Sequence, residues 1–361
     1  MDYQNPTMFN VLAGLVVLVV ALKLVQRLSL PNKKPSERVK IIGAVNGLLK
    51  YSQNACGIVD RKKALFFKMS KPHQDLGNTT LKRYQTARTH LQANSVVLND
   101  VCQAAIKRYS INSWELATHQ SAPVWSAYET FNHIIRDFCD LNDHQRTQLF
   151  TCIINHMPPC QPQAANVLLP GSGVGGLAFK LADLGYNVDA LELDPALHIV
   201  AQYAQESTLS YSVYPWALDF SHLEHGFDQA QLGIVSFPGQ TDKEGGKTNF
   251  IYNDFLRHKP TSLYQCIVTL FFIDTAENAF QYLEQISKML QVGGTWINYG
   301  PIKWGTAPRI EFSLDELISL LPSMGWDITD TWKGTTRYNG SPESMWTASY
   351  TIVGWKAIKR E

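Results

Sequence analysis

The chain lacks the runs of lysine and arginine that mark a nucleic-acid-binding surface. Its 361 residues carry 32 Lys and Arg against 31 Asp and Glu, which gives a formal net charge of +1. Because binding to a phosphate backbone needs clustered positive charge, the composition predicts no nucleic-acid partner. Internal repeats and low-complexity segments are also absent. Hydrophobic residues make up 45% of the chain and charged residues 17%, a balance that predicts a well-packed core.

Closely spaced cysteines are missing as well. The six cysteines are scattered and include no C-x-x-C pair; they are Cys56, Cys102, Cys139, Cys152, Cys160 and Cys266. A disulfide framework or a structural zinc site would need a more regular spacing. We therefore expect reduced, buried thiols and no metal.

One long apolar run stands at the N-terminus. The stretch "MFNVLAGLVVLVVAL" carries no charge, and its apolar character continues past Lys23 to Val25. At about 18 residues it is near the lower limit for spanning a bilayer. Basic residues follow it, which would hold the rest of the chain on the cytosolic side. We expect a membrane anchor over residues 1–30; a cleaved signal peptide and a buried or interfacial helix are the alternatives.

Helical and strand-like patterns divide the rest of the chain. After the polar linker "PNKKP", residues 36–159 show apolar residues at three- and four-residue spacing, which predicts a helical lobe over residues 31–160. From Ala165 onward short apolar runs alternate with helical segments. The runs "NVLLP", "NVDALEL", "CIVTLFFI", "TWINYG" and "ASYTIVGWKAI" read as strands, and "ENAFQYLEQISKMLQVGG" reads as a helix ending at Gly293 and Gly294. This alternation predicts an α/β domain over residues 161–361 with a doubly wound, mostly parallel sheet.

A glycine-rich turn lies between the first strand and its helix. In "GSGVGG", Gly171 and Gly173 let the backbone approach a ligand closely, and the helix that follows offers free N–H groups. Glu192 ends the second strand, 21 positions after Gly171, where a carboxylate can accept both hydroxyls of a ribose. Both NAD and S-adenosylmethionine present such a ribose. The alternative is that the glycines only turn the chain.

Two features favour S-adenosylmethionine over NAD. The third glycine of the dinucleotide pattern falls on Gly176, yet nothing else in the chain suggests a hydride-transfer site. The pair Asp254 and Phe255, ahead of the long apolar strand, fits a methyltransferase in which an acid and an apolar side chain cradle adenine. We therefore expect Gly171, Gly173, Glu192, Asp254 and Phe255 to bind S-adenosyl-L-methionine.

Four segments together resemble the carnosine N-methyltransferase family. They are "VLLPGSGVGGLAFKLADLGYNVDALE", "YPW" at 214–216, "FFIDTAEN" at 271–278 and "GGTWINYGP" at 293–301. The resemblance runs from about residue 136 to the C-terminus. It implies a Rossmann-like methyltransferase fold and methyl transfer from S-adenosylmethionine to a small imidazole peptide. The N-terminal lobe resembles the family only loosely, and the apolar run is not part of its usual pattern.

The resemblance also implies which residues contact the substrate. Asp274 follows the apolar strand at the edge where open α/β sheets bind ligands, and the family places an acid there, with Phe271 lining the pocket. Tyr338 and Tyr350 match two substrate-contacting tyrosines of the family, twelve residues apart. The alternatives are a helix cap for Asp274 and an ordinary strand residue for Tyr350.

Two further positions show agreement with the family and departure from it. Arg136 in "HIIRDF" matches an arginine that pairs with the methionine carboxylate of the donor, whereas His133 replaces a glutamine; a surface helix residue is the alternative for Arg136. After "GP" the family carries a histidine that touches the imidazole, and here Gly305 is the nearest residue, with Trp304 or Lys303 free to form another wall.

We therefore expect an S-adenosylmethionine-dependent N-methyltransferase acting on the imidazole of carnosine or a related small histidine-containing peptide, with Asp274 as its catalytic residue. A methyltransferase for another small amine and an inactive membrane-anchored scaffold are the alternatives. The expected partners are a small-molecule or dipeptide substrate and a membrane, with a homodimer left open. The catalytic domain is expected to face the cytosol.

Overall fold

The fold is described from a computed structural model that covers residues 35–159, 165–240, 246–305, 307–337 and 340–360. The chain forms two compact units, residues 1–40 and residues 41–361. In the first unit only residues 35–40 are described, and they include the start of helix α2 (Glu37–Leu49). The anchor predicted over residues 1–30 lies outside the described residues. None of the helices within the described ranges is long and apolar enough to cross a membrane.

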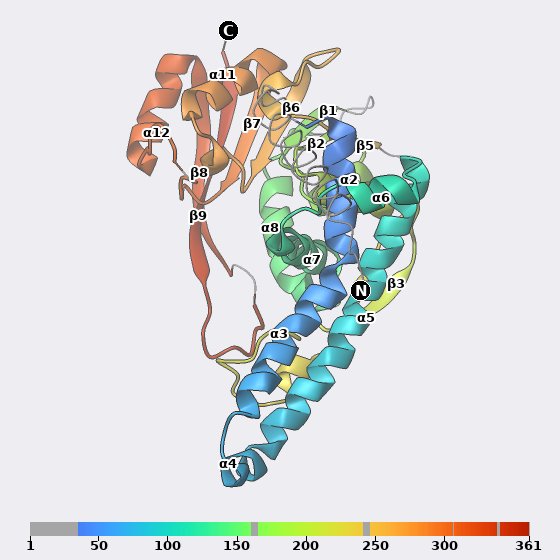
Figure 1. Ribbon diagram of the computed structural model, residues 1–361. Helices are drawn as coiled ribbons and strands as arrows, with labels where there is room; N and C mark the ends of the chain where they lie inside the picture. Colours follow the sequence, from blue (N-terminus) through green and yellow to red (C-terminus); the bar gives the residue numbers. More distant parts are fainter. Residues whose placement is uncertain (1–34, 160–164, 241–245, 306, 338–339, 361) are drawn as a thin grey trace, which may run out of the picture. The chain divides into compact units, whose positions relative to one another are not determined.

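The second unit is built on a seven-stranded sheet in the order β5-β2-β1-β6-β7-β9-β8 (Figure 1). Neighbouring strands are parallel from β5 to β7, whereas β9 is antiparallel to both β7 and β8. The strands are β1 (Asn166–Pro170), β2 (Asn187–Glu192), β5 (Thr248–Tyr252), β6 (Tyr264–Leu270), β7 (Leu290–Gly300), β8 (Trp326–Arg337) and β9 (Ser349–Lys359). The predicted doubly wound, mostly parallel sheet is confirmed.

Helices cover both faces of this sheet. They are α8 (Asp143–Ile154), α9 (Gly176–Asp183), α10 (Pro195–Glu206), α11 (Ala279–Met289) and α12 (Leu314–Leu320). On β1 the side chains of Val167 and Leu169 pack with α8 and α9, while Leu168 packs with α11 and α12. Because alternate side chains of the strand are buried on opposite faces, β1 reads as a continuous apolar run in the sequence.

The helix predicted to end at Gly293 and Gly294 is shorter, so that prediction was wrong. Helix α11 ends at Met289, and both glycines lie inside β7. The pairing of β7 with β6 is irregular between Tyr264 and Cys266, and Gly293 there has a φ of +74°. The glycines therefore allow an irregularity in the pairing of the strand and do not cap a helix.

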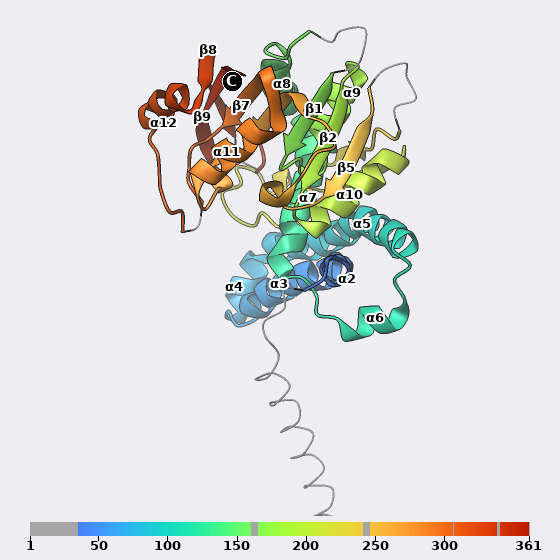
Figure 2. The same ribbon diagram turned by 90° about the horizontal axis from the view of Figure 1, so that it is seen from above.

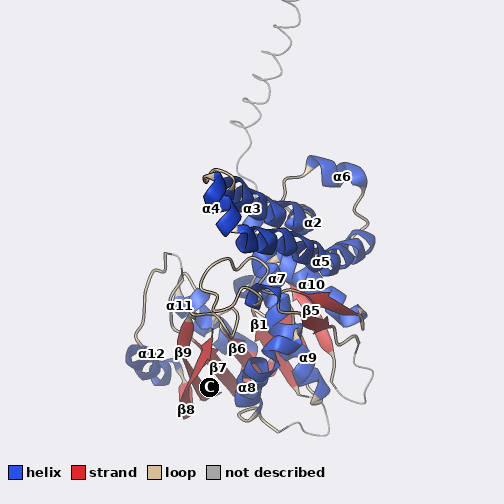
Figure 3. Ribbon diagram, turned by 90° about the horizontal axis from the view of Figure 1, so that it is seen from below, coloured by secondary structure: helices blue, strands red, loops and turns tan. Residues whose placement is uncertain are grey.

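The part of the chain predicted as a helical lobe, residues 31–160, is helical over most of its described length, and the domain boundaries stay a prediction. Beside α2 and α8 it contains α3 (Tyr51–Phe66), α4 (Lys71–Leu76), α5 (Asn78–Arg108), α6 (Ser113–Thr118) and α7 (Val124–Phe138). Figure 2 shows α5 beside α10, and Figure 3 shows α7 between the other helices of the lobe and the strands. One apolar cluster joins α3, α5 and α7 to α10 and to the small sheet of β3 (Ser210–Val213) and β4 (Gly233–Ser236). This packing places α7 beside the ligand-binding edge of the sheet.

Candidate active site

A cavity of about 570 Å³ lies where β1, β2 and β6 end. Its lining includes Leu169 and Gly171 from β1 and its turn, Glu192 from β2, and Leu270 and Phe271 from β6 and the residue that follows. The carboxyl ends of parallel strands at a point where the strand order reverses are the usual ligand site of this architecture. Residues from α7 and from the segment after β7 close the cavity.

The glycine turn after β1 has a shape that only glycine adopts easily. Gly171, Gly173 and Gly175 have φ values of +66°, +59° and +94°. A Cβ on Gly171 would lie 2.4 Å from Cδ2 of Phe272, and one on Gly173 would lie 3.3 Å from Nη2 of Arg136. The turn thus needs its glycines, and Gly171 and Gly173 lie in the cavity wall as predicted.

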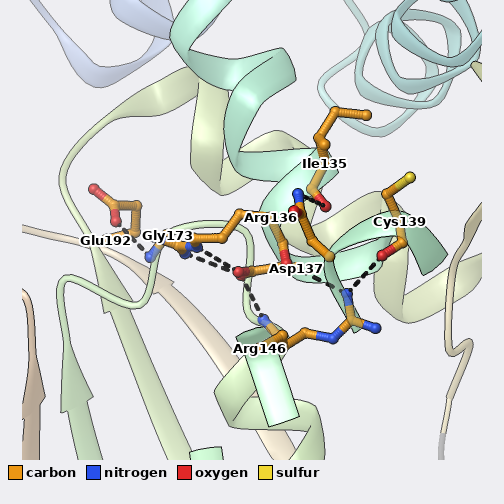
Figure 4. A network of polar contacts seen from close by, with 9 residues as sticks. Ile135, Arg136, Asp137, Cys139, Arg146, Gly173 and Glu192 are labelled. Carbon is orange, nitrogen blue, oxygen red and sulfur yellow. Dashed lines mark hydrogen bonds and ion pairs between the residues drawn. The ribbon is translucent and has the colours of Figure 1, made fainter. Parts of the chain in front are cut away.

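Glu192 lines the cavity and is anchored there by main-chain N–H groups (Figure 4). Its Oε2 accepts a 2.8 Å hydrogen bond from Gly173, and its Oε1 accepts 2.7 Å bonds from Leu193 and Asp194. Burial raises the pKa of Glu192 to about 7, while the three N–H donors act in the opposite direction. Two carboxylate oxygens have about four acceptor positions, so the group can still accept bonds from a ligand.

Arg136 of α7 lies beside the same turn and is paired with Asp137, a carboxylate that the sequence patterns did not indicate. Its Nε and Nη2 donate to Oδ1 and Oδ2 of Asp137 at 2.6 and 3.1 Å (Figure 4). Oδ2 of Asp137 also accepts a 3.1 Å bond from the amide of Gly176, the first residue of α9. Asp137 is 5% exposed. It therefore fixes both the guanidinium and the N-terminus of the helix beside the glycine turn.

Two polar atoms in the cavity wall are buried without a partner among the described residues. They are Oγ of Ser172 and Nδ1 of His133. Burial, with the nearby charge of Arg136, lowers the pKa of His133 to about 3, so the ring is neutral. Buried polar groups normally form hydrogen bonds, and these two point to a polar ligand. Together with Glu192, they are the polar groups of this wall that could hold the sugar and amino-acid portions of the expected donor.

Phe271 and Asp274 line the part of the cavity beyond β6. Phe271 has a φ of +52°, a strained conformation for a residue with a Cβ, and strain of this kind gathers at functional sites. Asp274 is 7% exposed, and its Oδ2 accepts a 3.2 Å bond from the amide of Lys303. Burial raises the pKa of Asp274 to about 6, although the Lys303 amide and charge oppose the rise.

The alternative interpretation of Asp274 as a helix cap is wrong. The capping side chain of α11 is that of Asn278, whose oxygen accepts a 3.2 Å bond from Phe280. Asp274 lies instead in the 3-10 turn η4 (Ile273–Thr275), and no side-chain cap bond is made at the start of that turn. Its carboxylate is thereby left facing the cavity.

The segment after β7 and the last strand complete this wall. Tyr350 of β9 lies 6.4 Å from Phe271 between ring centroids, and Nζ of Lys303 lies 5.8 Å from the Tyr350 ring centre. Trp304 and Gly305 also line the cavity, and Nε1 of Trp304 donates to the carbonyl of Phe312 at 2.7 Å. Tyr338, the other predicted tyrosine, lies outside the described residues.

Asp254 and Phe255 are the two predicted donor-binding residues that do not line the cavity. They follow β5, the strand beside β2, and the amide of Asn253 bonds to the carbonyl of Glu192 at 3.1 Å. Oδ1 of Asp254 caps the short turn η3 (Phe255–Arg257) through Leu256, and Phe255 is buried against Phe272. Their contact with adenine stays a prediction.

The sequence matches a family model and several curated proteins. A family model described as carnosine N-methyltransferase matches residues 114–361. A Schizosaccharomyces pombe protein named carnosine N-methyltransferase is 26% identical over 86% of this chain and 93% of its own length. An uncharacterized Saccharomyces cerevisiae protein is 31% identical over 64% of this chain, and the mouse carnosine N-methyltransferase 26% over 55%. The matched regions span about half of these last two relatives, 54% of each.

Solved structures with related folds were also found. The magnesium protoporphyrin IX methyltransferase of Synechocystis with bound S-adenosylhomocysteine is 13% identical, with a TM-score of 0.41 over 65% of this chain and 94% of that one. The N-methyltransferase NodS of Bradyrhizobium japonicum in complex with S-adenosylhomocysteine is 14% identical, with a TM-score of 0.37 over 63% of this chain and 91% of that one.

Proposed function

This chain belongs to the carnosine N-methyltransferase family, with S-adenosylmethionine as its methyl donor, and we propose that it methylates the imidazole of carnosine or of a related small histidine-containing peptide. The observation that carries the proposal is that one cavity holds both Glu192 and Asp274. The first residue lies beside the glycine turn, and the second lies beyond the end of β6. A donor at one end and an acceptor at the other would share this space.

The residues beside the donor end hold and orient it. Glu192 is placed to accept the ribose hydroxyls, because its oxygens are fixed by three main-chain amides. Arg136 is placed to pair with the carboxylate of the amino-acid portion, since it lies over Gly173. When bound, the donor would supply the methyl group of its sulfonium: a nitrogen lone pair in line with the S–C bond forms the new N–C bond as the S–C bond breaks, and the neutral thioether is the leaving group.

The residues at the other end present that lone pair. An imidazole has a reference pKa of about 6.5, so much of it is neutral at physiological pH and needs positioning more than activation. The carboxylate of Asp274 can accept the N–H of the ring or a positive end of the substrate, which turns the opposite nitrogen toward the methyl group. Phe271 and Tyr350 form apolar walls that keep the ring in place and exclude water.

A second candidate function is methylation of a different small metabolite amine. Gly305 stands where the family carries an imidazole-contacting histidine, and its neighbours Lys303 and Trp304 line the cavity instead. This wall suits an acceptor of another shape or charge. An inactive scaffold is the third candidate. Oγ of Ser172 and Nδ1 of His133, which are buried and have no partner among the described residues, speak against it because they suit a bound ligand.

The proposal also covers the place of the protein in the cell. The uncharged run between Met8 and Leu22, followed by basic residues, supports a membrane anchor with the catalytic domain on the cytosolic side. A small-molecule or dipeptide substrate suits a cavity of about 570 Å³. A homodimer is also part of the proposal. The mass of the protein in solution tests it.

A methylation assay with labelled S-adenosylmethionine and a panel of imidazole dipeptides and simple amines tests the function. Transfer to carnosine or a related peptide supports the proposal. Transfer to an amine without an imidazole favours the second candidate. Calorimetry with the donor separates the third, because a scaffold without donor binding would release no heat.

A further inference from the structure

A second cavity, of about 290 Å³, lies between the helical lobe and the segment that follows β3. Aromatic side chains form much of its wall, namely Tyr51 of α3, Tyr128 and Phe131 of α7, and Trp216. The carboxylate-bearing residue in the wall is Asp219. We call this space the aromatic cavity. Nothing in the proposed chemistry so far uses it.

The segment that carries Trp216 and Asp219 is held firmly against the lobe. The side chain of Asn94 on α5 donates to the carbonyl of Tyr214 at 2.8 Å and accepts from its amide at 2.7 Å. The ring of His90 stacks on Tyr214 with 3.7 Å between centroids. The amide of Asp219 bonds to the carbonyl of Trp216 at 2.9 Å, which closes a turn. The main chain that carries Trp216 and Asp219 is therefore held against α5 without a ligand.

Asp219 has no counter-charge among the described residues. Within the described part of the chain its carboxylate takes part in no hydrogen bond or ion pair. Burial alone raises the pKa of this half-buried group, with no charged neighbour contributing. A carboxylate withdrawn from water without a partner costs free energy, so a ligand that restores the partner would bind favourably.

The aromatic cavity adjoins the candidate active site through a small intervening space. Asn132, Asn142 and Gly340 line both the aromatic cavity and this intervening space. The intervening space in turn shares His133, Arg136 and Phe271 with the cavity that holds Glu192 and Asp274. Of the cations that line the intervening space, Arg136 pairs with Asp137 and Arg146 pairs with Asp143, and Arg337 lies there as well. An acceptor could therefore extend from the methyl-transfer end toward Asp219.

We propose that the aromatic cavity binds a positively charged ammonium group of the methyl acceptor, with Asp219 as its counter-ion and the rings of Trp216, Tyr51 and Tyr128 as its walls. Cations bind favourably over the faces of such rings, and most of all over tryptophan. This inference rests on the proposed methyltransferase function, because it assigns a binding site to the end of the acceptor that lies away from the methylated nitrogen. It predicts selection for acceptors that carry a free amine.

Direct binding tests the site without any methyl transfer. Tetramethylammonium and its uncharged counterpart tert-butanol are titrated into the full chain, and binding is followed by calorimetry or ligand-observed NMR. We expect the wild type to bind the cation and not the alcohol. Asp219→Asn should weaken cation binding at least tenfold. Glu224→Gln, which removes an exposed carboxylate from the same segment, should leave cation binding unchanged.

Kinetics with carnosine and N-acetylcarnosine test whether the cation belongs to the acceptor. Acetylation removes the positive charge of the amine and keeps the imidazole. Asp219→Asn should raise the KM for carnosine about 10- to 100-fold with little change in kcat, and should leave the KM for N-acetylcarnosine as it is. Donor affinity should be the same in both proteins, because Asp219 lies outside the donor end of the cavity.

The outcomes separate failure of this inference from failure of the proposed function. Equal cation binding by the wild type and Asp219→Asn, or no binding by the wild type, overturns the inference whatever the enzyme methylates. If Asp219→Asn loses cation binding yet keeps the wild-type KM for every charged acceptor that is methylated, the assignment of the cation to the acceptor is overturned. The same assignment is overturned if the enzyme methylates no charged acceptor at all. A misfolded variant is excluded by its melting temperature, which should not fall, since the substitution removes an unpaired charge.

Discussion

The amide of Gly173 donates a 2.8 Å hydrogen bond to Oε2 of Glu192, which joins the turn after the first strand to the end of the second across 19 residues. The bond fixes the carboxylate where the strand order of the sheet reverses, and it leaves acceptor positions facing the cavity. The proposed placement of the donor depends on this relationship.

Glu192→Ala should weaken donor binding by about a hundredfold or more. Two charge-assisted bonds to ribose hydroxyls, each worth about 1.5–3 kcal/mol, would be lost. Calorimetry with S-adenosylmethionine measures the effect, and circular dichroism confirms that the variant is folded. An unchanged dissociation constant would show that the ribose binds elsewhere.

Donor affinity should also depend on pH through the same carboxyl. Its pKa of about 7 in the folded protein exceeds the ordinary value of 4.5, so the protonated form is favoured by folding. The stability that this protonation contributes is fully present below pH 4.5 and is lost as pH rises through 7. Since the ionised form is the better acceptor for ribose hydroxyls, donor binding should tighten between about pH 6 and 8. Glu192→Gln should give a nearly flat profile, and an identical slope in both proteins would refute the assignment.

Asp274→Asn should leave donor binding nearly intact and slow methyl transfer about 30- to 1000-fold. The change removes one charged contact in a buried pocket, worth about 2–4 kcal/mol in the transition state. The amide oxygen can still accept the bond from the Lys303 amide, so the fold should survive. Single-turnover kinetics and donor calorimetry on one preparation measure both quantities. Normal turnover would remove Asp274 from the site.

Asp137→Ala should destabilise the protein and weaken donor binding together. The substitution removes the acceptor for the Arg136 guanidinium and for the first amide of α9. With hydrogen bonds to a buried charge lost, the free energy of unfolding should fall by about 2–3 kcal/mol. Urea denaturation measures the stability, and calorimetry measures the donor. Asp143→Ala is the matched control, because its partner Arg146 also bonds to the Cys139 carbonyl. Equal losses of stability and of donor affinity in the two variants would show that Asp137 has no positioning role.

Deleting residues 1–30 should release a soluble enzyme that still binds the donor. The residues assigned to the donor begin with Arg136 on α7, far along the chain from the predicted anchor. Cell fractionation of full-length and truncated chains, followed by calorimetry, provides the measurement. The expectation fails if the truncated chain stays with membranes after a salt wash, or if it folds without binding the donor.

Local sequence patterns were sufficient where one segment determines its own structure. One strand–helix–strand unit contains both the glycines between β1 and α9 and the acid at the end of β2. Because their positions depend only on this local unit, their place in the cavity wall was predictable. Strand β8 was not predicted, because it lies at the edge of the sheet and most of its residues are only partly buried or exposed. Its apolar signal is accordingly weak.

Contacts between distant segments were beyond the sequence patterns. Asp137 and Gly176 are 39 residues apart, and only the packing of α7 beside the glycine turn brings them together. Gly293 looked like a helix cap because a glycine after a helical run commonly is one, yet strand pairing with β6 took precedence. The aromatic cavity likewise joins α3, α5, α7 and the segment after β3, which no local motif indicates.

The central claim is that one cavity brings a methyl donor at Glu192 to an imidazole at Asp274. The most direct measurement is mass spectrometry and NMR of the product formed from carnosine and isotopically labelled S-adenosylmethionine by the wild type, Glu192→Ala and Asp274→Asn. The account predicts one labelled methyl group on an imidazole nitrogen in the wild type and sharply reduced product in both variants. Donor binding with no methylation of any imidazole peptide, or methylation that both variants retain, would contradict it.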